Sequence, residues 1–111
     1  MTPTHRKLLE DMRDAAADIS LFTQGKSLAE FLGDKQLRWS IERGFEIIGE
    51  ALTQLTKLDA SLASRITDHR KIISFRNVLI HGCSQITSTV TWDIVENKLP
   101  VLRRELAEIL Q

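Results

Sequence analysis

Apolar residues recur every three or four positions along almost the whole chain, and strict alternation over strand lengths is rare. This spacing predicts helices and no sheet. The first helix is expected to begin at Thr2 and Pro3 or at Thr4, where a hydroxyl would cap it, and to end at Gly25. Its apolar stripe contains Leu8, Met12, Ala15, Ile19 and Phe22.

Two more helices are predicted in the first half. The letters SLAE have the spacing of a capping box between Ser27 and Glu30, so a short helix should begin there and end near Gly33. The longest helix should run from about Asp34 to Leu58, because its apolar residues fall in one arc about 80° wide. Gly44 lies inside this arc, where its missing side chain would let another helix approach closely.

The second half predicts two further main helices. DASLAS, at positions 59–64, is typical of a loop or short turn, and a helix should then run from Ile66 or Asp68 to His81. A last helix is expected to kink or break at Pro100, since proline lacks an N–H and clashes with the preceding turn. The prediction is an all-α fold: one domain, residues 1–111, forming an antiparallel bundle of four main helices plus one short helix.

Composition restricts the kinds of partner. The 111 residues are 42% hydrophobic, which allows one modest core that a partner subunit could extend. Fifteen basic and fifteen acidic residues cancel, so any RNA or nucleotide site must be local. A single cysteine fits a reducing compartment. Without a signal-peptide pattern or an apolar run of ~18 residues, the chain is expected to be cytoplasmic and not to enter a membrane.

An arginine interrupts the apolar face of the predicted fourth helix. At 100° per residue Arg76 falls among the large apolar residues, whereas Ser74, Asn77 and His81 form a separate polar wedge. A charge at such a position is costly unless it finds a carboxylate or an opening. The apolar arc covers more than half of the circumference, which favours cover by the bundle and by a second subunit.

Arg76 and His81 each have a structural and a functional interpretation. Arg76 could reach the surface or pair with a glutamate of the third helix, and His81 could favour the helix dipole beside a left-handed Gly82. Alternatively, both bind an anion. Residues five apart lie about 140° apart around a helix, so a shared site requires either that the helix ends at His81 or that two chains meet across a two-fold axis.

The letters RNVLIH, with Arg76, Asn77 and His81, resemble the signature of HEPN domains. Three further blocks resemble the HepT-like branch in order and spacing, namely LFTQGKSLAEFLGD, ERGFEIIGEAL and WDIVENKLPVLRREL. The resemblance implies a homodimeric, metal-independent endoribonuclease, the toxin of a toxin–antitoxin pair whose antitoxin is a small nucleotidyltransferase. It also implies that Arg76 and His81 are catalytic in RNA cleavage through the 2′-hydroxyl, with Asn77 in support.

The chain departs from the family pattern at Cys83, where the family commonly has the tyrosine that the antitoxin modifies with AMP. There is no tyrosine anywhere in the sequence. The antitoxin would then act by binding alone, or the chain is a catalytically inactive HEPN protein that binds a nucleotidyltransferase or a nucleotide.

Other candidates are weaker, and no cofactor or metal is predicted. His81 and Cys83 alone do not make a zinc site. The acidic stripe of the third helix, formed by Glu42, Glu46 and Glu50, is expected to be solvated. Arginine pairing and antitoxin contact are the alternatives for Glu50. Trp39 and Trp92 are expected in the core or an interface.

Overall fold

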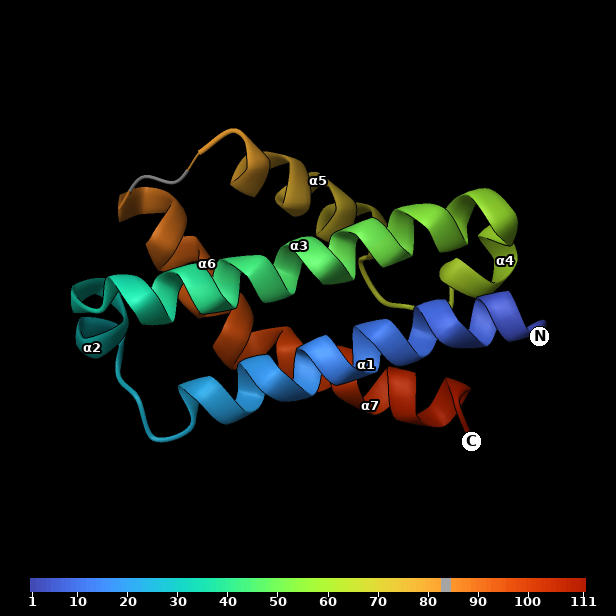
Figure 1. Ribbon diagram of the computed structural model, residues 1–111, viewed down its shortest axis with the longest axis horizontal. Coiled ribbons are helices and arrows are strands. Elements are labelled where there is room, and N and C mark those ends of the chain that lie inside the picture. Colours follow the sequence, from blue (N-terminus) through green and yellow to red (C-terminus); the bar gives the residue numbers. More distant parts are fainter. Residues whose placement is uncertain (83–84) are drawn as a thin grey trace.

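The computed structural model describes residues 1–82 and 85–111, which form helices joined by short turns (Figure 1). α1 and α3 run antiparallel through the middle, α5 lies along one side of α3, and α6 and α7 cross behind them (Figure 1). The helices of the described residues are α1 (Pro3–Thr23), α2 (Leu28–Gly33), α3 (Lys35–Leu58), α4 (Ala60–Ala63), α5 (His69–Ile80), α6 (Gln85–Asn97) and α7 (Leu99–Ile109).

Side-chain caps fix where the first three helices begin. The Thr2 hydroxyl accepts from the His5 backbone N–H at 3.2 Å, and His5 Nδ1 accepts from the Thr2 N–H. Ser27 and Glu30 make the predicted capping box, with both hydrogen bonds at 3.1 Å. The Asp34 carboxylate caps the first turn of α3. The predicted starts of these helices are therefore confirmed.

The contact between α1 and α3 forms much of the core. A Cβ on Gly44 would lie 2.7 Å from Cγ1 of Ile19, so glycine lets the two helices approach as predicted. Side chains from both helices are fully buried around this contact, namely Leu9, Met12, Ile19, Ile41, Ile48, Leu52 and Leu55.

The predicted stripe of α1 is wrong at its end, where Phe22 is 45% exposed and Thr23 is buried. The buried face also includes Leu9 and Ala16, each seven residues from the next, and this row continues to Thr23. Phe22 lies at the margin of that face. The Thr23 hydroxyl donates to the Ile19 carbonyl at 2.8 Å, so burial leaves it paired.

The C-terminal segment is divided as Pro100 predicted. Asn97 ends α6, and the proline lies in the first turn of α7, where no N–H is needed. Trp92 of α6 is buried against Phe31 of α2, with ring centroids 5.1 Å apart. Pro100 divides the last predicted helix into two, and Ala60–Ala63 forms a further short helix. The described chain therefore has five longer helices and two short ones, instead of the predicted four and one.

α5 is the least covered of the longer helices in the described chain. Its main contact is with α3, and Leu79 is its one buried residue. Val78 and Ile80 are 49% and 51% exposed. The predicted homodimer would cover such residues. No helix of the described chain combines the length and apolar character needed to span a membrane.

Candidate functional site

Two of the predicted catalytic residues, Arg76 and Asn77, lie in the C-terminal half of α5, and the third, His81, directly follows the helix. The helix follows Asp68, which adopts a left-handed conformation (φ 58°), and its last residue is Ile80. His81 is the C-cap with helical backbone angles, and its N–H donates to the Asn77 carbonyl at 3.3 Å. Gly82 then turns the chain with φ +112°, which confirms it as the left-handed residue after the helix.

Arg76 extends from α5 across α3. Its Nη2 donates to Glu50 Oε2 at 2.5 Å, and its Nη1 donates to Asn77 Oδ1 at 3.4 Å. The Arg76 side chain is 26% exposed and that of Glu50 48%. The structural interpretation, pairing with a glutamate of the third helix, is therefore confirmed as a contact. The Arg76 side chain nevertheless remains partly exposed at the surface.

Gly49 makes this contact possible. A Cβ at Gly49 would lie 2.4 Å from Cβ and 2.7 Å from Cγ of Arg76, so the stem of the arginine occupies the space of a side chain. Sequence reasoning identified Gly44 and missed Gly49. A signal was available, because glycine inside a helix costs roughly 0.5–1 kcal/mol relative to alanine and so requires a local reason.

Asn77 and His81 are exposed, as the predicted polar wedge requires. α5 ends at Ile80 with His81 as its C-cap, so the helix does end at His81, as the first of the two conditions requires. His81 keeps helical backbone angles (φ −81°, ψ 0°), so its side chain still leaves α5 at the position of a regular helical residue. The two residues remain about 140° apart around the axis. Within one chain, the arginine and the histidine therefore face different directions.

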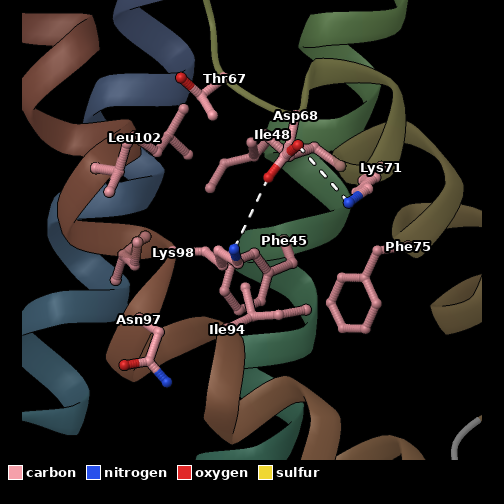
Figure 2. Close-up of a pocket in the computed structure, with 13 residues that line it drawn as sticks. Phe45, Ile48, Thr67, Asp68, Lys71, Phe75, Ile94, Asn97, Lys98 and Leu102 are labelled. Carbon is pink, nitrogen blue, oxygen red and sulfur yellow. Dashed lines mark ion pairs between the residues drawn. The ribbon is translucent and has the colours of Figure 1, made fainter.

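A cavity of about 220 Å³ lies on another side of α5 (Figure 2). Its lining includes the apolar side chains of Phe45, Phe75 and Ile94. Asp68 also lines it, and its carboxylate oxygens lie 3.8 Å from the ammonium groups of Lys71 and Lys98. None of Arg76, Asn77 and His81 lines it. The cavity and the predicted site are thus separate features.

The remaining candidates are spread over the molecule. Cys83 lies outside the described residues. Trp92 is buried as predicted, but Trp39 is 62% exposed, with Lys35 Nζ 4.8 Å above its ring. Among the side chains that the structure describes, no three His, Cys, Asp or Glu residues are placed to hold a metal ion.

The acidic stripe of α3 remains at least partly exposed, and two of its members make ion pairs. Glu46 is 3.9 Å from Arg43 on the same helix. Glu50 is the member that crosses to α5, and its other oxygen accepts from Gln54 Nε2 at 3.1 Å. The arginine-pairing alternative for Glu50 is therefore confirmed.

Comparison with known proteins assigns the family. A family model described as "Ribonuclease HepT-like" matches residues 12–109. "Putative RNase MJ0127" of Methanocaldococcus jannaschii is 32% identical over 96% of this chain and 87% of its own. "Probable ribonuclease HepT" of Thermococcus cleftensis is 29% identical over 98% of each chain. No solved structure matches significantly. The chain belongs to the HepT-like ribonuclease family.

Proposed function

We propose that this chain is a metal-independent endoribonuclease whose site combines Arg76, Asn77 and His81 from two copies. One observation carries the proposal: in a chain of a ribonuclease family, a surface guanidinium and an exposed imidazole occur within two turns of one poorly covered helix. Neither residue is needed to fill the core.

The residue types suit cleavage by the RNA's own 2′-hydroxyl. His81 takes the proton of the 2′-hydroxyl or gives one to the departing 5′-oxygen. Arg76 neutralises the charge that develops on the phosphoryl oxygens, and Asn77 supports it through its side-chain oxygen. The 2′-oxygen bonds to phosphorus as the bond to the 5′-oxygen breaks. The products are a 2′,3′-cyclic phosphate and a 5′-hydroxyl, and the internal nucleophile needs no metal ion.

A two-fold dimer through α5 resolves the angle between the two residues. Arg76 and His81 of one chain face different directions on the same helix. A two-fold axis beside α5 would place the histidine of each copy near the arginine of the other. Half-exposed Ile80 lies between Arg76 and His81 around the axis of α5 and supplies apolar surface for the contact.

The family resemblance supports a toxin role in the cytoplasm, with a nucleotidyltransferase as antitoxin. Because the chain has no tyrosine, this antitoxin cannot act by attaching AMP to one. We propose that it neutralises the toxin by binding, with Cys83 at the position that the family modifies.

A second candidate is a non-catalytic protein that binds a nucleotidyltransferase or a nucleotide. The zero formal charge and the missing tyrosine favour it. It predicts a stable complex with the partner and no growth arrest when this chain is expressed alone.

The deciding experiment compares the wild type with His81→Ala, and with His69→Ala as a matched control at the other end of α5. The wild type should arrest growth and cleave RNA in EDTA to cyclic phosphate ends. His81→Ala should do neither while keeping its helical circular dichroism, and His69→Ala should behave as the wild type. An active His81→Ala variant would end the catalytic proposal, and an inactive wild type would favour the binding protein.

A further inference from the structure

Arg76 is one member of a chain of four polar side chains that crosses from α3 to α5. Gln54 Nε2 donates to Glu50 Oε1 at 3.1 Å, Glu50 Oε2 accepts from Arg76 Nη2 at 2.5 Å, and Arg76 Nη1 donates to Asn77 at 3.4 Å. Each oxygen of the Glu50 carboxylate therefore has its own donor. A carboxylate held at both oxygens presents a fixed direction to the guanidinium.

The stem of Arg76 is restricted as well as its head. Gly49 leaves the space that the arginine Cβ and Cγ occupy on α3, so the side chain leaves α5 in one direction. The two hydrogen bonds use only some of the N–H donors of the guanidinium, and other donors stay available to an anion. The arrangement orients the arginine without using up its capacity to bind phosphate.

From this geometry we infer that Glu50 is a positioning residue of the nuclease: it aims the Arg76 guanidinium at the scissile phosphate and, as a neighbouring negative charge, weakens the binding of RNA. The inference rests on the proposed function. Glu50 would then act on two quantities in opposite directions, turnover and the binding of RNA. An ordinary structural ion pair would not separate these two effects. Orientation contributes to turnover, whereas the carboxylate charge opposes the approach of an anionic substrate.

The test measures kcat and apparent KM for Glu50→Ala and Glu50→Gln on a labelled, mixed-sequence single-stranded RNA. Glu50→Ala should lower kcat about 10-fold to 100-fold, the range that a small misplacement causes, with apparent KM unchanged or lower. Glu50→Gln should lower kcat less, because the glutamine amide oxygen can still accept a hydrogen bond from Arg76. Glu46→Gln is the matched control from the same stripe and should behave as the wild type.

Two comparisons make the result specific. In an Arg76→Lys background, which keeps the positive charge without the planar guanidinium, Glu50→Ala should cause a smaller loss of kcat than in the wild-type background, since it acts through the guanidinium. Circular dichroism and thermal melting should show that the variants remain folded, as expected for a carboxylate that is 48% exposed. The inference is overturned if Glu50→Ala cleaves at least as fast as the wild type while Arg76→Ala and His81→Ala are inactive. It is also overturned if Glu50→Ala loses as much in the Arg76→Lys background as in the wild-type background.

A readout without catalysis distinguishes failure of the inference from failure of the proposed function. In ¹⁵N spectra, the Nη–H groups of Arg76 should rotate slowly in the wild type. In Glu50→Ala they should rotate as freely as the Nη–H groups of the exposed Arg104. If Arg76 rotates freely in the wild type, Glu50 does not position it. If its rotation is slow but Arg76→Ala and His81→Ala cleave normally, the ion pair is real and both the nuclease site and the role of Glu50 in it are refuted.

Discussion

α3 carries two glycines that admit a side chain from a neighbouring helix, and they serve different ends. Gly44 receives Ile19 of α1, which is 1% exposed, in the apolar core. Gly49 receives the stem of Arg76 of α5, whose charged head lies at the surface beside Glu50. The same device of a missing Cβ thus brings a hydrophobic side chain into the core at one position and orients a guanidinium at the other.

The two contacts also differ in how strongly they hold the helices. Apolar burial contributes roughly 1.5–3 kcal/mol for each large side chain, and α1 shares several such residues with α3. A partly exposed ion pair contributes about 0–1 kcal/mol. α5 also packs Phe75 against Phe45, but it buries only Leu79, whereas α1 buries seven residues. α5 is therefore fixed more weakly than α1, although it carries the candidate site. Substitutions at the two contacts and at the exposed end of α5 test this difference.

Ile19→Ala should remove the side chain that fills the space at Gly44. We expect the free energy of unfolding to fall by about 2–5 kcal/mol, because a buried cavity remains that glycine cannot fill. Denaturant titration followed by circular dichroism measures this change. Val90→Ala is the control, since Val90 is 48% exposed and its truncation should matter little.

Gly49→Ala should both destabilise the fold and reduce RNA cleavage. The added methyl group would meet Arg76 at its Cβ, which cannot rotate away, so α5 must shift at a cost of about 1–3 kcal/mol. Gly44→Ala should cost a similar amount but leave cleavage by the folded protein unchanged. Equal loss of activity in both variants would show that Gly49 has no special relation to the site.

Arg76→Ala should abolish cleavage while changing the free energy of unfolding by less than about 1 kcal/mol, since the pair is partly exposed. Denaturation and RNA cleavage assays on one preparation measure both quantities. A fall of several kcal/mol in the free energy of unfolding would mean that Arg76 mainly stabilises the fold, as Ile19 does.

Ile80→Asp should change the stability of the single chain least, because Ile80 is 51% exposed. If α5 forms the proposed dimer contact, the substitution should convert the dimer to monomer in sedimentation equilibrium and reduce cleavage. Val90→Asp alters a similarly exposed apolar residue on α6 and should leave the dimer intact. Dissociation by both variants, or by neither, would argue against the contact through α5.

Much of the fold follows from short-range chemistry in the sequence. The capping residues Ser27 and Asp34 fix helix starts because their side chains bond to backbone N–H groups within three residues. Pro100 divides the last two helices because its ring cannot continue the preceding one. The exposed wedge of Asn77 and His81 also follows from the period of the helix alone.

Other features depended on contacts between distant segments. The sequence indicated that Arg76 needs a carboxylate or an opening, but three glutamates of α3 were available. The register of α5 against α3, which Gly49 permits, selects Glu50. Likewise, the burial of Thr23 in place of Phe22 depends on how α1 is rotated about its axis against the neighbouring helices. Local periods and caps determine which segments are helices, whereas the partners of side chains depend on the distances between helices, which only the packed structure decides.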